Sequence, residues 1–343
     1  NGFGYALSWL AVLTIAVLLF GCDSHSSNTS LRVFVADSLA RPFRQLNIAF
    51  EAKNPGVEIV QISSGSVLAA RKLTQANDRA DVLAVADYNV MDRELRPAYA
   101  NWSICFATNE VVIVYTDMSR GASEIASDNW FEILSRPEVQ VQAANPFHDP
   151  CGYWTELCWK LSDLYYTSSS AGSIHEAMTA KCGPAKDRRS DSQKLLQLVE
   201  TAGGVDYAFV YRSQAMQHNL SFLRLPPQIG LGDAGHIKFY RRAVIKLPLS
   251  NPGTRGRSAF EKRGDTIVFA LTIPKTVREL SLAAKYVRFL LSPEGKAILS
   301  SQHLMVVDQP WTYDDLDRLP DEIRPYVVER SKPKSDEEGA RSG

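Results

Sequence analysis

Serine side chains gather in two turns near the start of the chain, and hydroxyl groups in such turns can bind an anion. The first turn contains Ser38, and the second contains Ser64 and Ser66 on either side of Gly65. Each turn precedes a predicted helix, whose first turn offers unpaired N–H groups and the positive end of the helix dipole. Two such turns that face one point would form an anion site. Serine is also a common N-cap residue, so either turn alone is explained by helix capping.

A third turn combines a carboxylate with a thiol. Asp149 is followed by Pro150 and Cys151, and Asp before Pro is a typical N-cap and N1 pair. A carboxylate repels a bound oxyanion unless it bonds to the central atom of the anion or accepts a proton from it. Considered alone, this turn favours a helix cap.

Cys151 and His148 also raise a hypothesis of a different class, an exported enzyme with a thiolate nucleophile and a histidine base. Pro150 at the first helical position would bring Cys151 into the first helical turn, close in sequence to His148. No third residue that would orient the imidazole is evident. We therefore predict that the protein is not an enzyme.

Strands and helices alternate in the pattern of the first hundred residues. Apolar residues indicate strands at 31–35, 57–62 and 82–86, and amphipathic helices at 39–50 and 67–76. This order implies a parallel sheet with helices on its faces. Because ligands of such sheets sit beyond the carboxyl ends of the strands, both serine turns lie where a ligand would bind.

Two further predicted strands indicate that the chain crosses into a second domain and back. The strand at 111–115 leads into a second α/β domain, and the strand at 267–273 returns from it. We expect an α/β protein of two lobes, each a mostly parallel sheet flanked by helices, joined by two crossing strands. A hinge between such lobes closes on a small ligand and excludes water. The predicted boundaries are 31–114 and 265–320 for the first lobe, 115–264 for the second lobe, and 321–343 for a disordered tail.

The chain begins with a hydrophobic segment at 6–20, followed by Gly21 and Cys22. The segment is shorter than the about 20 apolar residues of a membrane span, and with the cysteine it predicts a lipoprotein signal peptide at 1–21. Cys22 would carry the lipid, and the polar residues 22–30 would form a tether. We expect the protein to face the periplasm or the extracellular side, with the lipid anchor as its only membrane contact.

Charge and cysteine spacing argue against several other classes. Lys and Arg together number 38, as do Asp and Glu, so no overall field favours a nucleic-acid partner, and we expect none. In an oxidising compartment the other cysteines have three possible pairings, among which the sequence does not choose. They lack the paired C-x-x-C spacing of a zinc site, so we predict no structural metal. These cysteines are Cys105, Cys151, Cys158 and Cys182.

Several segments together resemble the tungstate- and molybdate-binding proteins of ABC importers, in the order seen in that family. The segments are 37–43, 64–66, 80–88, 149–153, 206–213, and 272–274 with 291–295. The resemblance implies a type II periplasmic-binding fold that holds tungstate or molybdate between its lobes, without catalysis. It also implies delivery of the ligand to a membrane permease driven by a cytoplasmic ATPase. We expect a monomer without a cofactor.

Carried over by position, the family's ligand contacts fall on the three turns and on one strand residue. They are Asp37, Ser38, Ser66, Asp149, Pro150, Cys151 and Val210. In this branch of the family two carboxylates reach the metal centre of the anion and expand its coordination from four oxygens to six. Asp149 matches the first carboxylate, and its two oxygens would let it cap the helix and contact the ligand.

The sequence departs from the family pattern within this site. Val210 stands where the second carboxylate, usually Glu, is expected, Asp37 replaces a usual Gly, and Trp154 replaces a usual Arg. The loss of a carboxylate at position 210 removes both a ligand atom and a repulsive charge. We hypothesise that the anion stays four-coordinate, or five-coordinate through Asp149 alone, and binds more weakly. Asp37 adds a negative charge unless it turns away to cap the following helix.

Two other interpretations remain open. Protonated phosphate or arsenate donates a hydrogen bond, so Asp149 and Asp37 could select such an anion over fully ionised molybdate. Alternatively, the protein is a degenerate relative that keeps the fold but has lost the ligand and any transport role.

Overall fold

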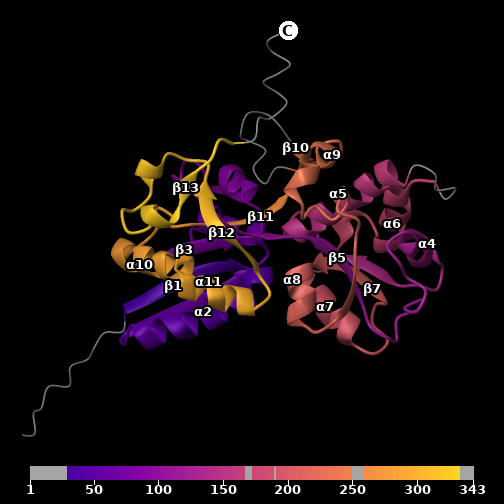
Figure 1. Ribbon diagram of the computed structural model, residues 1–343, viewed down its shortest axis with the longest axis horizontal. Helices are drawn as coiled ribbons and strands as arrows, with labels where there is room; N and C mark the ends of the chain where they lie inside the picture. Colours follow the sequence, from indigo (N-terminus) through magenta and orange to yellow (C-terminus); the bar gives the residue numbers. More distant parts are fainter. Residues whose placement is uncertain (1–28, 167–171, 189–190, 249–258, 333–343) are drawn as a thin grey trace, which may run out of the picture.

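The computed structural model describes residues 29–166, 172–188, 191–248 and 259–332. Figure 1 shows two lobes, with β1, β3 and α10 in one and β5, β7 and α4 in the other. The predicted signal peptide, Cys22 and most of the predicted tether lie outside the described residues. None of the helices in the described ranges is long and apolar enough to cross a membrane.

The first lobe contains a seven-stranded sheet in the order β13-β12-β4-β11-β3-β1-β2. Its strands are β1 (Thr29–Ala36), β2 (Val57–Ser64), β3 (Val82–Val85), β4 (Ile104–Asn109), β11 (Ile267–Thr272), β12 (Met305–Thr312) and β13 (Val328–Glu329). Its helices are α2 (Ala40–Lys53), α3 (Ser66–Thr74), α10 (Leu280–Leu291) and α11 (Pro293–Ser301), and the 3-10 turn η1 (Asp37–Leu39) precedes α2.

The second lobe contains a four-stranded sheet in the order β6-β7-β5-β8 and a separate β9–β10 hairpin. Its strands are β5 (Val111–Tyr115), β6 (Val141–Ala143), β7 (Tyr207–Tyr211), β8 (Ser221–Arg224), β9 (Val244–Pro248) and β10 (Ala259–Arg263). Its helices are α4 (Trp130–Ser135), α5 (Pro150–Tyr165), α6 (Ile174–Cys182), α7 (Ser192–Glu200), α8 (Arg212–Gln217) and α9 (Ile237–Tyr240).

The N-terminal βαβαβ unit forms as the sequence predicts. Leu39, Phe43, Leu46 and Phe50 form the buried stripe of α2 and its start, since each is at most 1% exposed. β1 pairs in parallel with both β2 and β3. The carboxyl ends of β1 and β2 therefore lie side by side and lead directly into η1 and α3. The two serine turns occupy these two ends.

The prediction of mostly parallel sheets is only partly correct, because the strands at the crossings between the lobes are antiparallel to their neighbours. In the second sheet β6 is parallel to β7, but β5 is antiparallel to both β7 and β8. In the first sheet β11 is antiparallel to β3 and β4, and β12 is antiparallel to β4. The physical reason is that β5 and β11 enter from the other lobe, so the crossing sets their direction.

The first crossing occurs at Glu110, which separates β4 from β5. Val111 already pairs with Tyr211 of the second sheet. The first lobe therefore ends before residue 111, and not at 114 as predicted, because the continuous apolar pattern of the crossing strand hides the change of sheet. The second crossing runs from β10 into β11.

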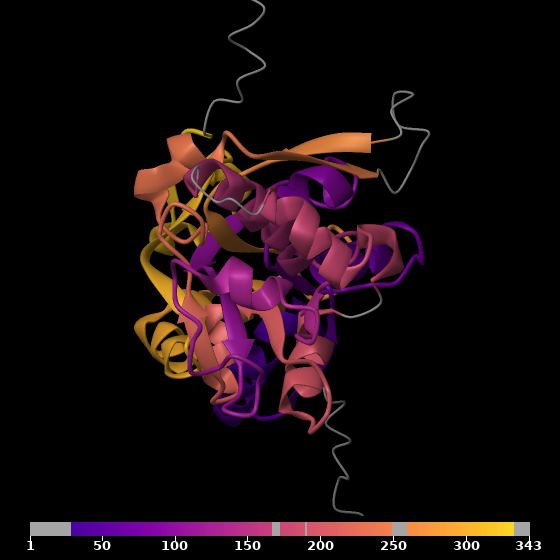
Figure 2. The same cartoon turned by 90° about the vertical axis from the view of Figure 1, so that its right-hand side faces the viewer.

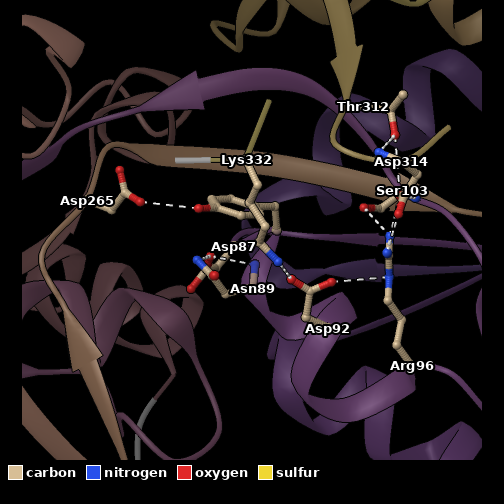
Figure 3. Close-up of polar contacts among 10 residues, drawn as sticks. Asp87, Asn89, Asp92, Arg96, Ser103, Asp265, Thr312, Asp314 and Lys332 are labelled. Atoms are coloured by element: carbon tan, nitrogen blue, oxygen red, sulfur yellow. Dashed lines mark hydrogen bonds and ion pairs between the residues drawn. The ribbon is translucent and has the colours of Figure 1, made fainter. Parts of the chain in front are cut away.

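The prediction of a disordered tail from residue 321 is wrong for residues 321–332. Ile323 is fully buried, and β13 pairs with the end of β12. Figure 3 shows the contacts that hold this end, in which Lys332 pairs with Asp92 and Asp92 pairs with Arg96 at 3.2 Å. A few apolar side chains and this ion-pair network outweigh the polar composition that suggested disorder.

Candidate anion-binding site between the lobes

Two turns of the first lobe present hydroxyl groups that are buried without a partner. Ser38 on η1 is 2% exposed, and its Oγ makes no hydrogen bond. Ser64, the last residue of β2, has a buried Oγ that also lacks a partner. A buried polar group without a partner is destabilising and therefore needs an explanation. A ligand that accepts hydrogen bonds from both turns would supply one.

Ser66 lies at the start of α3 and has one role within the fold. It is fully buried, and its Oγ accepts a hydrogen bond from the backbone N–H of Ala86 at 2.9 Å. A hydroxyl that accepts one hydrogen bond retains its own proton for a second acceptor. Ser66 can therefore support the loop after β3 and still donate to an anion.

The turns of the two lobes are in direct contact. A Cβ atom on Gly65 would lie 2.4 Å from the carbonyl oxygen of His148 and 3.5 Å from the Cα atom of Asp149, so glycine alone fits there. On the neighbouring turn, η1 packs against α7 of the second lobe. The structure thus brings the Ser38 and Ser66 turns together with the Asp149 turn, as the sequence predicts for a site between lobes.

Asp149 joins two helices of the second lobe. Its Oδ1 accepts the N–H of Cys151, and its Oδ2 accepts the N–H of Ser192, both at 2.9 Å. One carboxylate therefore caps α5 and also bonds to the first residue of α7. Burial raises the pKa of Asp149, although these hydrogen bonds oppose the shift. Both oxygens already bond to backbone amides, so the predicted contact between Asp149 and the ligand, which stays a prediction, would use a remaining lone pair of one of these oxygens.

The next two predicted contacts offer little to a ligand. Pro150 has no N–H, and the N–H of Cys151 is engaged by Asp149. The Cys151 thiol is fully buried, and burial raises its pKa well above the ordinary range. Such a thiol lacks the thiolate character of a nucleophile, so the hypothesis of an enzyme gains no support from this residue. Among the residues that the structure describes, Cys105, Cys151, Cys158 and Cys182 are all free thiols.

Val210 lies within β7 opposite Val112 of β5 and is fully buried. Its side chain supplies no oxygen atom to a ligand. Over the described ranges, no group of three or more His, Cys, Asp or Glu residues is arranged to hold a metal ion.

Sequence reasoning missed Tyr211, which follows Val210 at the end of β7. The side chain is fully buried, and its hydroxyl has no hydrogen-bond partner. Burial raises its pKa, and Cys151 and Asp149 raise it further. The ring packs edge-on against Phe269 of the first lobe at 5.4 Å between centroids. The sequence did offer a signal for this residue, because Tyr211 follows Val210 within the segment 206–213 that carries part of the family resemblance.

Asp37 has an unusual electrostatic environment. Burial, followed by Asp149 and Asp191 of the second lobe, raises its pKa to about 7, and Lys72 opposes the shift. Its Oδ2 is buried without a partner. A carboxyl group with this pKa is protonated in a large fraction of molecules at neutral pH, so it can donate a hydrogen bond. Asp37 does not cap α2 through its side chain, which leaves it available to a ligand.

The arrangement is suited to binding rather than to catalysis. The unpartnered hydroxyls of Ser38, Ser64 and Tyr211 come from both lobes, and Ser66 and Asp37 add two further donors. Hydroxyl donors in a region shielded from water form strong hydrogen bonds to an anion.

The fold and this site define a two-lobed, type II periplasmic-binding protein. The chain belongs to the family of bacterial extracellular solute-binding proteins, whose model matches residues 31–304. An uncharacterized solute-binding protein of Petrotoga mobilis is 37% identical over 313 residues, which cover 91% of this chain and 94% of that protein. The molybdate/tungstate-binding protein WtpA of Thermococcus kodakarensis is 35% identical over 350 aligned positions, which cover 93% and 96%.

Solved structures of low sequence identity share the fold. The periplasmic molybdate-binding protein of Azotobacter vinelandii has a TM-score of 0.58 at 14% identity, with 81% of this chain and 100% of that chain covered. The sulfate-binding protein SubI of Mycobacterium tuberculosis H37Rv also has a TM-score of 0.58, at 13% identity, with 88% and 94% covered. These likenesses confirm the predicted fold, and the sequence relatives confirm the predicted resemblance.

Proposed function

We propose that this protein is the solute-binding component of an ABC importer and captures tungstate or molybdate between its lobes. The observation that carries the proposal is the presence of buried hydroxyls without a partner on both lobes, Ser38 on the first and Tyr211 on the second. The similarity to WtpA supports this choice of anion. The partners would be a membrane permease and its ATPase, and Cys22 would carry a lipid anchor. Binding and delivery require no cofactor and no catalysis.

The donor set favours an anion that keeps four oxygens around its central atom. Val210 offers no carboxylate, and both oxygens of Asp149 bond to backbone amides. An additional bond from Asp149 to the metal centre would compete with two helix caps. X-ray absorption on the tungstate-loaded protein should therefore detect four oxygen neighbours around tungsten, and six would contradict this part of the proposal.

A thermal-shift panel of tungstate, molybdate, sulfate and phosphate tests the function itself. A ligand at 100 times its Kd stabilises the folded state by about 2.7 kcal/mol, which raises the melting temperature measurably. We expect the largest shifts with tungstate and molybdate. If no oxyanion shifts the transition, the interpretation as a degenerate relative replaces the proposal.

A second candidate ligand is a protonated anion of the phosphate or arsenate type. The observation in its favour is the unpartnered Oδ2 of Asp37, which accepts a hydrogen bond when it is ionised. Competition calorimetry separates the candidates. If phosphate binds and tungstate does not displace it, the result would favour a phosphate-type anion over tungstate or molybdate as the ligand.

A further inference from the structure

Asp87 follows β3 in the first lobe and divides its hydrogen bonds between the two lobes. Oδ1 accepts the backbone N–H and the side-chain amide of Asn89 at 2.9 and 3.0 Å, and Figure 3 shows the two side chains together. Oδ2 accepts the Tyr153 hydroxyl at 2.5 Å and the Lys262 ammonium at 2.6 Å. The first oxygen is thus held by its own lobe, and the second bonds only to the other lobe.

The two donors to Oδ2 are fixed to the second lobe. Tyr153 lies on α5, one turn after the Asp149 cap, and Lys262 lies on β10 of the β9–β10 hairpin. Figure 2 shows this hairpin as the orange strands along the upper edge of the molecule. β9 packs against α5, and the Lys262 Nζ atom lies 4.0 Å from the ring centroid of Trp154. A movement that carries α5 and β10 away from the loop after β3 would therefore separate both donors from Asp87.

All three groups are deeply buried in this closed arrangement. The side chains of Asp87 and Lys262 are 0% and 6% exposed, and Tyr153 is fully buried. Burial disfavours the ionised form of Asp87, but the charge of Lys262 and the hydrogen bonds outweigh it, so the pKa of Asp87 is lowered. Burial lowers the pKa of Lys262 as well, against the attraction of Asp87. Removal of one partner of this buried ion pair leaves the other without its counter-charge.

We propose that Asp87, Tyr153 and Lys262 form an interlobe latch that favours the closed arrangement and slows release of the bound solute. These are positioning residues, because they act on the lobes and not on the ligand. The effect on solute release rests on the proposed function. The effect on lobe closure does not, since the latch is made of the protein's own groups.

The latch should affect dissociation more than association. Ligand enters the open arrangement, in which the latch is already broken, whereas release requires that it break. A ligand that binds the closed arrangement also loses apparent affinity when that arrangement is less populated. The expected signature is a large rise in koff, with kon rising only as far as the open fraction of the ligand-free protein rises.

Lys262→Met removes the charge and keeps a similar apolar stem over Trp154, and Tyr153→Phe removes the hydroxyl alone. Lys246→Met, on the exposed face of the paired strand β9, serves as the matched control. Stopped-flow measurements with tungstate should give a koff raised about tenfold in Lys262→Met and severalfold in Tyr153→Phe, with kon within about twofold. Lys246→Met should match the wild type in both rate constants.

Small-angle X-ray scattering of the ligand-free proteins tests the latch even if no oxyanion binds. The radius of gyration should be larger for Lys262→Met than for the wild type and Lys246→Met. Scattering curves that coincide for all variants, or a koff of both latch variants within twofold of the wild type, would overturn the proposal. An expanded Lys262→Met without oxyanion binding would instead support the latch and reject the proposed ligand. Tyr153→Phe serves as the second test if Lys262→Met does not fold.

Discussion

The carboxylate of Asp149 accepts the backbone N–H of Ser192 at 2.9 Å, and this bond connects the N-cap residue of α5 to the first residue of α7. The same carboxylate caps its own helix through Cys151. Because η1 packs against α7 and Gly65 packs against the Asp149 turn, this residue organises the second-lobe side of the site. These contacts give Asp149 a structural role within the second lobe.

Asp149→Asn should destabilise the protein more than loss of an ordinary cap. An amide retains one acceptor oxygen, but its NH₂ group opposes a backbone N–H, so one of the two bonds is lost in a buried region. We expect the free energy of unfolding to fall by about 2 kcal/mol in urea titrations. Asp191→Asn, which affects a cap of α7 alone, is the control and should give a smaller loss. Equal losses would contradict the double role of Asp149.

Ser38→Ala should weaken ligand binding without weakening the fold. The Ser38 hydroxyl is buried and has no partner within the protein, so its removal deletes no hydrogen bond from the ligand-free state. We expect an unchanged or slightly higher free energy of unfolding and about a tenfold weaker Kd for tungstate by calorimetry. Ser66→Ala is the contrasting variant, because it also removes the acceptor for the Ala86 N–H, so it should lower the free energy of unfolding as well as weaken tungstate binding.

Tyr211→Phe tests the contribution of the second lobe to the site. The phenol ring keeps its packing against Phe269, and only a hydroxyl without a partner is removed. Affinity for tungstate should fall about tenfold while the melting temperature of the ligand-free protein stays the same or rises. An unchanged affinity would show that this hydroxyl does not reach the ligand.

The raised pKa of Asp37 predicts a dependence on pH. The folded state holds this proton more tightly than the unfolded state, so its contribution to stability is fully present below the ordinary pKa and is lost as pH rises through about 7. The groups that face Asp37 are Asp149 and Asp191, which raise the pKa, and Lys72, which lowers it.

Urea titrations between pH 4 and pH 8 should therefore show wild-type stability falling with pH relative to Asp37→Asn. A protonated Asp37 donates a hydrogen bond, so the affinity for a dianion should also strengthen as pH falls from 8 to 6. Parallel stability curves for the two proteins would contradict the raised pKa.

Val210→Glu would introduce the carboxylate that related proteins are expected to carry at this position. In the ligand-free protein a buried carboxylate at the end of β7 should lower the melting temperature, because burial disfavours its charge. Tungstate should restore more stability than sulfate does, since only a metal centre accepts the carboxylate as a ligand. X-ray absorption should then detect more oxygen neighbours around tungsten than in the wild type. Equal thermal shifts with both anions would contradict this prediction.

Local pattern was sufficient to predict much of the fold and to select the turns of the candidate site. The apolar stripe from Leu39 to Phe50 and the alternation of strands and helices predict a parallel βαβαβ unit, because periodicity follows directly from which face of each element is buried. The serine turns follow from that order, since the carboxyl ends of parallel strands meet at one edge of the sheet. The ordered motifs then carried the resemblance to oxyanion-binding proteins.

Tertiary structure decided which atoms are available to a ligand. The sequence places Asp149 before a helix, but only the packing of α7 beside α5 brings the Ser192 amide to its second oxygen. Likewise, the hydroxyl of Tyr211 is unpartnered and the pKa of Asp37 is raised because the lobes meet around them. Short-range pattern records which residues are apolar or polar, whereas hydrogen-bond partners and electrostatic surroundings depend on residues far apart in the chain. For that reason the sequence by itself selected the turns of the candidate site, and the contact between the lobes decided which groups there remain without a partner.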